Sequence, residues 1–202
     1  MNILVCVKQV PDTTAVKIDP VTNTLIRAGV PSILNPFDGF ALEMALQMKD
    51  KTGGTVTVMS MGPAQAEDVL RESLSVGADE AYLVSGREFG GSDTLATSYI
   101  LSCAVKAVEE KRGEKFDVIY CGKQAIDGDT GQVGPEMAEH LSYTQITYAT
   151  ELVACEGDKV QVRKETADGY DVLEAALPVV ISVTKTPFEL RYPTVKKRLA
   201  AN

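Results

Sequence analysis

The feature that most constrains the fold is a repeated change of hydrophobic period along the chain. Apolar runs of strand length at 3–7, 55–60, 81–84 and 116–121 alternate with longer segments whose apolar residues recur at helical spacing. Runs that are apolar at consecutive positions are typical of strands buried on both faces of a parallel sheet. Strands that alternate with helices in this way predict βαβ units with right-handed crossovers, and hence a doubly wound α/β fold.

The pattern changes after Tyr143, where runs of strand character follow one another with no helix between them. These runs cover residues 146–155, 160–164, 172–177 and 179–183, with turns containing Gly and Asp among them. Successive strands joined by tight turns are typical of an antiparallel meander. We therefore expect a Rossmann-like α/β domain over 1–184, whose mostly parallel sheet carries an antiparallel β-meander extension at about 145–184.

Two short segments near the start of the chain also predict local structure. Residues 16–19 and 24–27 alternate in polarity around a turn, so a small hairpin is expected after the first strand. The turn Asn35-Pro-Phe-Asp38 then stops the extended chain, and helical spacing begins after it. Asp38 is the expected N-cap of that helix, because a short carboxylate can accept a main-chain N–H there.

Charge and composition exclude several classes of protein. The 202 residues include 20 Lys and Arg against 28 Asp and Glu, a formal charge of -8, whereas sequence-independent nucleic-acid binding requires a basic surface. The longest nearly apolar run, 175–183, is too short to cross a bilayer, so membrane insertion is not expected. The four cysteines are far apart and include no C-x-x-C pair, which favours a reduced, cytoplasmic protein.

The most informative stretch is the glycine-rich segment 122–135, which follows a buried strand and precedes a predicted helix. Open α/β sheets bind their ligands at this end of the strands. Gly128, Gly131 and Gly134 permit positive φ and close approach of a ligand to the backbone. Successive N–H groups from about 130 to 133 can then form an anion-binding nest at the start of the helix.

Asp127 and Asp129 make a bare phosphate cup unfavourable, because two carboxylates repel an anion. We interpret them as an acceptor for a ribose hydroxyl and a helix cap, with Lys123 or water offsetting their charge. A glycine-rich turn without any ligand remains an alternative, and a Mg²⁺-dependent phosphohydrolase built on the two aspartates is a further one. The segment matches neither a Walker A loop nor the G-x-G-x-x-G fingerprint.

Other candidate residues leave their roles open. The amide of Asn35 can read an adenine or a ribose if its turn reaches the same end of the sheet as the glycine loop. The alternative, favoured by the pattern alone, is a helix entry with Asp38 as cap and Phe37 as hydrophobic staple. His140 is the only histidine and is expected to be structural. No cysteine or histidine cluster has metal-ligand spacing, and no residue is nominated as catalytic.

Several of these segments together resemble the β subunit of electron transfer flavoproteins. The matching pieces are 5–12, 35–38, 60–65, 77–79, 122–127, 177–180 and 191–195, in the family's order along the whole chain. The resemblance implies a Rossmann-like domain that pairs with a larger α subunit. It also implies passage of electrons from flavin-dependent dehydrogenases of the acyl-CoA type to an acceptor, with no catalysis by this chain alone. A stress- or signalling-type adenine-nucleotide-binding module of similar fold is the alternative.

The resemblance further implies an adenine nucleotide in the glycine-loop region. The family's site falls by motif on Cys6, Asn35, Pro36, Phe37, Asp38, Met61, Gly122, Lys123, Gln124, Ala125, Ile126, Asp127, Gly128, Asp129, Thr130, Gly131, Gln132 and Val133. Some members hold AMP there, and the branch that performs flavin-based electron bifurcation holds a second FAD. Residues 8–13 and 127–135 are more similar to the bifurcating branch, so FAD is favoured over AMP.

The closing segment 185–202 is basic and contains Pro187 and Pro193, and it reads as a projecting arm or loop. It resembles the family's recognition loop, which implies that an apolar residue at Val195 docks into the dehydrogenase while neighbouring basic residues steer it. The implied partner-recognition residues are Tyr192, Val195, Lys196 and Lys197. Family members continue into an arm that wraps the α subunit, so we expect this chain to contain only the start of that arm.

Overall fold

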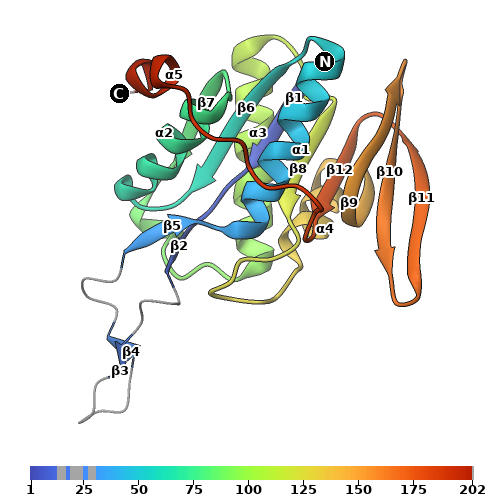
Figure 1. The fold of residues 1–202 in the computed structure, drawn as a ribbon. Coiled ribbons are helices and arrows are strands. Elements are labelled where there is room, and N and C mark those ends of the chain that lie inside the picture. The colour runs from blue at the N-terminus through green and yellow to red at the C-terminus, as the bar shows by residue number, and fades with distance from the viewer. Residues whose placement is uncertain (13–16, 19–24, 27–30, 202) are drawn as a thin grey trace.

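A computed structural model describes residues 1–12, 17–18, 25–26 and 31–201. Within these residues, eight strands form one central sheet in the order β11-β10-β9-β12-β8-β1-β6-β7 (Figure 1). The strands of this sheet are β1 (Asn2–Cys6), β6 (Thr55–Met61), β7 (Glu80–Val84), β8 (Val118–Gly122), β9 (Thr144–Glu156), β10 (Lys159–Thr166), β11 (Gly169–Ala176) and β12 (Val179–Val183). The fold is therefore the mostly parallel α/β sheet with an antiparallel extension that the sequence predicts.

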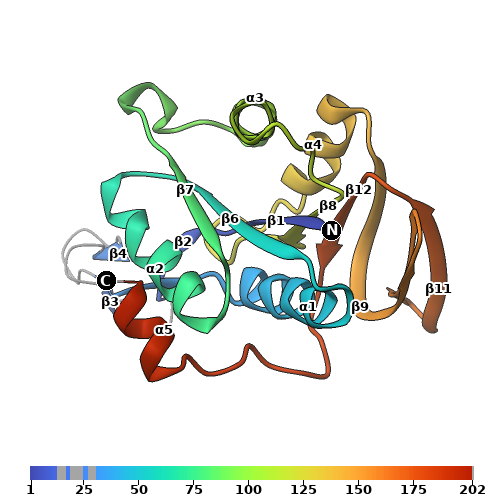
Figure 2. The ribbon, with the colours of Figure 1, turned by 90° about the horizontal axis from the view of Figure 1, so that it is seen from above.

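Helices cover both faces of the parallel part of the sheet. They are α1 (Pro36–Thr52), α2 (Glu67–Val76), α3 (Thr94–Arg112), α4 (Val133–Leu141) and α5 (Val195–Ala200), with short 3₁₀ turns η2 (Ala64–Ala66) and η3 (Arg87–Phe89). Figure 2 shows α1 and α2 on one side of the sheet and α3 and α4 on the other. Two apolar clusters result, one under each helical layer.

The order of strands reverses at β1, which pairs in parallel with β6 on one side and with β8 on the other. The chain goes outward from β1 through β6 to β7, and then returns to the far side of β1 to form β8. Crossovers therefore run to opposite faces on the two sides of this point. In open α/β sheets, ligands bind in the crevice that this reversal opens beyond the carboxyl ends of the strands.

The strands after Tyr143 differ in one respect from the predicted meander. The three strands β9, β10 and β11 are antiparallel neighbours, as predicted. The fourth run, β12, is instead parallel to both β8 and β9 and lies between them. All five residues of β12 are buried. A strand that is covered on both faces has a continuous apolar sequence, as this one does. The prediction of an antiparallel β12 was wrong. The continuous apolar run of β12 is typical of a parallel strand, but it was grouped with the preceding strands, in which polar and apolar residues alternate.

Helix ends follow the sequence at α3 but not at α1. The Asp93 carboxylate accepts the N–H of Ala96 at 2.8 Å, and Gly113 ends α3 with φ of 71°, both as predicted. In α1 the N-cap position belongs to Asn35, and Pro36 occupies the first turn. Asp38 lies inside that turn, so its prediction as the N-cap was wrong; its carboxylate is used elsewhere, as described below.

The predicted hairpin is present where the structure describes it. Strand β3 (Lys17–Ile18) pairs antiparallel with β4 (Leu25–Ile26), and the rest of the predicted 16–27 hairpin lies outside the described residues. A second small pair, β2 (Gln9–Pro11) with β5 (Ser32–Leu34), joins the end of β1 to the start of α1. This pair brings Lys8 and Asn35 together, because the N–H of Asn35 donates to the carbonyl of Lys8 at 2.9 Å.

The closing segment does not project, contrary to its prediction as an arm or loop. It runs back along α1 and ends in α5, which packs against α2 (Figures 1 and 2). The guanidinium of Arg191 donates to both carboxylate oxygens of the buried Glu43, at 2.8 and 2.9 Å, and pairs with Asp50. Phe188 packs on the core. These contacts join distant parts of the chain, so a local pattern cannot reveal them.

None of the helices in the described ranges has the length and apolar character needed to cross a membrane.

Candidate functional site

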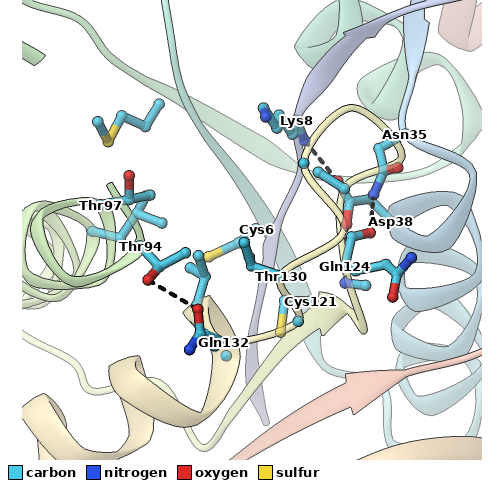
Figure 3. Close-up of a pocket in the computed structure, with 18 of the residues that line it drawn as sticks. Cys6, Lys8, Asn35, Asp38, Thr94, Thr97, Cys121, Gln124, Thr130 and Gln132 are labelled. Carbon is cyan, nitrogen blue, oxygen red and sulfur yellow. Dashed lines mark hydrogen bonds between the residues drawn. The ribbon is translucent and has the colours of Figure 1, made fainter. Parts of the chain in front are cut away.

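A cavity of about 650 Å³ opens beyond the carboxyl ends of β1, β6 and β8, at the point where the strand order reverses. Its size is typical of a small-molecule site. Figure 3 shows how side chains from β1, α3 and the loop after β8 converge there. The lining residues are Cys6, Val7, Lys8, Asn35, Asp38, Met59, Met61, Phe89, Gly91, Ser92, Asp93, Thr94, Thr97, Leu101, Cys121, Gly122, Lys123, Gln124, Ala125, Gly128, Asp129, Thr130, Gly131, Gln132, Val133 and Gly134.

Asp38 joins the two strands that flank the crevice. Its Oδ2 accepts the N–H of Lys8 at 2.8 Å, just past β1, and its Oδ1 accepts the N–H of Gly122 at 2.9 Å, at the end of β8. Gly122 is required at this point, because a Cβ there would collide with the Asp38 carboxylate. One buried carboxylate thus fixes the spacing of the two strand ends.

Burial raises the pKa of the Asp38 carboxyl from 3.8 to about 7, although the hydrogen bonds from the Lys8 and Gly122 N–H groups act in the opposite direction. The geometry favours the carboxylate, because both of its oxygens face N–H donors and a protonated oxygen would oppose one of them. Burial and hydrogen bonding together give the Asp38 carboxyl, at the floor of the cavity, a pKa of about 7.

Asn35 holds the start of the glycine loop. Its Nδ2 donates to the carbonyl of Gln124 at 2.9 Å (Figure 3), and its Oδ1 accepts the N–H of Ile126 at 3.2 Å. The side chain is 1% exposed although it borders the cavity. The structure therefore uses this amide to shape the loop. The turn is a helix entry, as one interpretation predicts, although Asp38 is not its cap.

The two loop aspartates are also engaged within the protein. Asp127 receives both hydrogen bonds of the Lys8 ammonium, at 2.7 and 2.9 Å, and is not among the lining residues. Asp129 accepts from the Gln124 amide at 2.6 Å. Neither caps α4, whose N-cap position is Gln132, so the predicted helix cap was wrong. The partner of Asp127 is Lys8, which sequence reasoning did not select because 119 residues separate them.

The second half of the loop presents unpaired donors. Within the described part of the chain, the main-chain N–H groups of residues 130–134 donate to no protein acceptor. They precede and open α4, where the helix dipole adds positive potential. Gly131 has φ of 67°, which turns the chain here, and its Cβ would lie 3.3 Å from the carbonyl of Lys123. Unpaired donors at a helix start are the feature that an anion-binding nest requires, and binding of an anion here stays a prediction.

The opposite wall comes from α3, and sequence reasoning missed it. Thr94 and Thr97 border the cavity, and the Thr94 hydroxyl lies 3.3 Å from the Gln132 Oε1, which connects α3 to the glycine loop (Figure 3). Deeper in, Met59 and Leu101 give an apolar surface. The Asp93 cap was a usable signal, because a helix that starts after β7 must start at the carboxyl edge of the sheet.

Four of the predicted cofactor-binding residues lie outside the lining: Pro36, Phe37, Ile126 and Asp127. Phe37 contacts Lys123 instead, whose ammonium lies 4.9 Å from the centre of its ring. His140 stacks edge-on against Tyr99 at 5.6 Å, in keeping with the structural role predicted for it. The predicted partner-recognition residues 192 and 195–197 are exposed and also lie outside the cavity.

The site offers binding groups more than reactive ones. In the described ranges, no three His, Cys, Asp or Glu side chains gather to hold a metal ion. Asp127 pairs with Lys8 and Asp129 accepts from Gln124, so neither carboxylate is free to bind the Mg²⁺ ion that the phosphohydrolase alternative requires. Unpaired donors at one end and an apolar surface at the other suit a ligand that is anionic in one part and aromatic in another.

Known proteins are similar to this chain over most of its length. A family model described as the electron transfer flavoprotein domain matches residues 22–201. The chain is 58% identical to electron transfer flavoprotein subunit beta of Megasphaera elsdenii, over 100% of this chain and 75% of that protein. It is 52% identical to caffeyl-CoA reductase-Etf complex subunit CarD of Acetobacterium woodii, over 96% and 72%. It is 50% identical to Protein FixA of Azotobacter vinelandii, over 95% and 68%.

A match of this extent covers the cavity, the glycine loop and the closing segment together, and it leaves the stress- or signalling-module alternative without support. The chain belongs to the electron transfer flavoprotein family, among its β subunits.

Proposed function

We propose that this chain is the β subunit of a heterodimeric electron transfer flavoprotein that works in the cytoplasm and binds an adenine nucleotide, FAD in preference to AMP, in the cavity beyond β1 and β8. With its α subunit it passes electrons between flavin-dependent dehydrogenases of the acyl-CoA type and an acceptor. The observation that carries the proposal is the run of unpaired N–H groups at 130–134, in residues that line a cavity of about 650 Å³.

The residues present fit such a group. Main-chain donors at a helix start bind phosphate oxygens without a lysine, and the left-handed Gly131 lets the chain curve around them. Asp38 and Asn35 hold the loop in place from behind. Met59, Met61 and Leu101 line an apolar region on which a planar ring can pack while water is excluded.

FAD is preferred because the cavity continues past the glycine loop. From Gly131 it extends to the start of α3 and to Phe89, beyond what the phosphate nest itself occupies. Gly128 has no atom within 4 Å of a would-be Cβ, which leaves open space beside the loop. A bound flavin would supply one- and two-electron redox chemistry, and the protein would supply its position and its surroundings. A second flavin in the heterodimer would permit flavin-based electron bifurcation.

The dehydrogenase would dock on the closing segment. Tyr192 is 90% exposed and Val195 78% exposed, and Lys196, Lys197 and Arg198 follow directly. An exposed apolar side chain beside three cations suits a partner pocket with an acidic rim. Replacement of Val195 by Asp should weaken electron transfer from the dehydrogenase and leave the nucleotide content unchanged. Equal transfer rates for the variant and the parent would remove this docking role.

The experiment that tests the function is a count of nucleotides in the native heterodimer. The chain is co-expressed with its α subunit, purified, denatured, and the released FAD and AMP are separated by chromatography. Two FAD per heterodimer are expected. One FAD with one AMP would assign AMP to this cavity and end the bifurcation proposal. Release of a single FAD and no AMP would contradict nucleotide binding by this chain.

A further inference from the structure

Three sulfur-bearing side chains lie in one row across the floor of the cavity. In the sheet register, Cys6 of β1 is the direct partner of Cys121 on β8 and of Met59 on β6. The three residues belong to one apolar cluster, on the face covered by α3 and α4. All three border the cavity, and the small exposed fractions of Cys6 and Cys121 give a small species access to the two thiols. Figure 3 shows Cys6 and Cys121 as neighbours beside the loop at Thr130 and Gln132.

The row is well shielded from solvent and still reachable. Cys6 and Cys121 are 8% and 7% exposed, and Met59 is fully buried. A Cβ on Gly134 would lie 2.7 Å from the Cys121 sulfur, so the missing side chain at this position is what leaves that sulfur uncovered. Soft thiolate and thioether donors in an apolar setting select soft metal ions and disfavour Mg²⁺ or Ca²⁺.

The strand spacing is compatible with a bridging ion. Neighbouring strands lie about 4.8 Å apart, and side chains at paired positions of parallel strands point the same way. A metal–thiolate bond is about 2.3 Å long, so two thiolates on opposite sides of one ion are about 4.6 Å apart. A disulfide accepts Cα atoms about 4.4 to 6.8 Å apart, so oxidation can join the same pair and the metal site requires reduced cysteines.

We propose that Cys6, Cys121 and Met59 form a binding site for a soft, thiophilic metal ion, with Cu(I) as its best-fitting occupant. Two thiolates and a thioether satisfy the low coordination numbers that Cu(I) accepts. Zn²⁺ is disfavoured, because it requires four ligands and both oxygens of the nearby Asp38 carboxylate already accept main-chain N–H groups. The two thiolates outweigh the single charge of Cu(I), so the occupied site carries one net negative charge.

Binding is coupled to proton release. Burial, with a contribution from Asp38, raises the pKa of the Cys6 thiol to about 12, and burial also raises the pKa of Cys121. The Cys121 thiol points toward the carbonyl of Ile181, at 4.0 Å. Each thiol therefore loses its proton to solvent as the Cu–S bond forms, and affinity rises with pH. The charged residues that line the cavity are Lys8, Asp38, Asp93, Lys123 and Asp129.

The test is a Cu(I) titration of the purified, reduced chain under anaerobic conditions, in competition with a coloured Cu(I) chelator. One Cu(I) per chain is expected, with release of two protons to a weakly buffered solution. Cys6→Ser and Cys121→Ser should each weaken binding by at least about 100-fold, and Met59→Leu by about 10-fold, as for the loss of a primary and a weaker ligand.

Two other cysteines provide matched controls. Cys103 is exposed on α3, and Cys155 lies 3.6 Å from the sulfur of Met1, which makes it a rival sulfur pair. Cys103→Ser and Cys155→Ser should each retain full affinity. Affinity that instead falls with Cys155→Ser, or that survives the double replacement of Cys6 and Cys121, would overturn the proposal.

A measurement on the unsubstituted chain tests the metal site even if the cysteine variants fail to fold. X-ray absorption of the copper-loaded protein should show sulfur neighbours only, and nitrogen or oxygen neighbours would contradict the site. Competition between Cu(I) and FAD is also expected, because both need the same cavity; this last point rests on the proposed function. Copper bound without any effect on FAD would count against FAD in this cavity and leave the metal site standing.

Discussion

The two halves of the glycine loop are built on opposite principles. From Gly122 to Asp129 the loop is held by other parts of the protein, through Asn35, Asp38 and Lys8. From residue 130 to 134 the main-chain donors have no protein partner in the described ranges. The first half fixes the position of the second, and the second is left to bind. Binding capacity here comes from donors left unpaired on a rigidly held segment.

The largest effect is expected from removing the anchor of the first half. Asp38→Ala would leave the partly buried N–H groups of Lys8 and Gly122 without acceptors. Each such group costs about 1 to 3 kcal/mol, so the free energy of unfolding should fall by about 2 to 6 kcal/mol. Urea denaturation measures it, with Asp158→Ala in an exposed turn as the control. A change within about 0.5 kcal/mol, as for an ordinary surface site, would show that Asp38 anchors nothing.

The second half is tested at Gly131. Gly131→Val places a β-branched residue at φ of 67°, which costs about 1 to 2 kcal/mol and forces the turn to change. The donors then lose their alignment, and FAD or AMP affinity, measured by calorimetry, should fall by at least about 10-fold. Gly157→Val is the matched control, because Gly157 has a similar φ of 59° in the turn between β9 and β10 and lies outside the cavity lining. Unchanged affinity in the Gly131 variant would separate the nest from nucleotide binding.

A pH series distinguishes the anchor from the rest of the protein. Burial raises the Asp38 pKa from 3.8 to about 7, so between these values the folded chain holds a proton that the unfolded chain has lost. The Asp38 contribution to the free energy of unfolding should therefore decrease as pH rises from 4 to 7, by at most about 1.4 kcal/mol per pH unit. Denaturation of Asp38→Asn in parallel should lack this slope. Identical slopes would assign the titration to other groups.

The smallest effect is expected for the solvent-exposed ion pair between Lys8 and Asp127. The Lys8 and Asp127 side chains are 48% and 31% exposed, so their ion pair is screened by water. Lys8→Met should lower the free energy of unfolding by less than about 1 kcal/mol. Asp127→Asn should match it, because either change removes the same pair. A loss as large as that of Asp38→Ala would mean that the ion pair, rather than the buried carboxylate, holds the loop.

Sequence patterns predicted the parts of the molecule that depend on neighbouring residues. The βαβ order, the Asp93 and Gly113 helix ends and the glycine-rich turn before α4 are all local, and the structure has each of them. The roles of Asn35 and Asp38 are not local. Their side chains form hydrogen bonds with main-chain atoms of the glycine loop, 84 to 91 residues further along the chain. Only the fold reveals that these residues shape the loop.

The remaining differences have similar physical causes. The wall formed by Thr94 and Thr97 was missed because hydroxyl side chains on a helix carry no distinctive motif. The row of sulfurs was missed because three unrelated strands contribute one residue each. The contacts that hold the closing segment against α1 could not be predicted. The ion pair between Arg191 and Glu43, for example, joins residues that are 148 positions apart in the sequence.

The same ion pair gives helix α1 a second role. Glu43 and Asp50 receive Arg191 along the middle and end of the helix, and Asn35 and Asp38 at its start hold the glycine loop. The exposed side chain of Tyr192 therefore follows directly on a residue that is bonded to α1, the helix whose start holds the glycine loop.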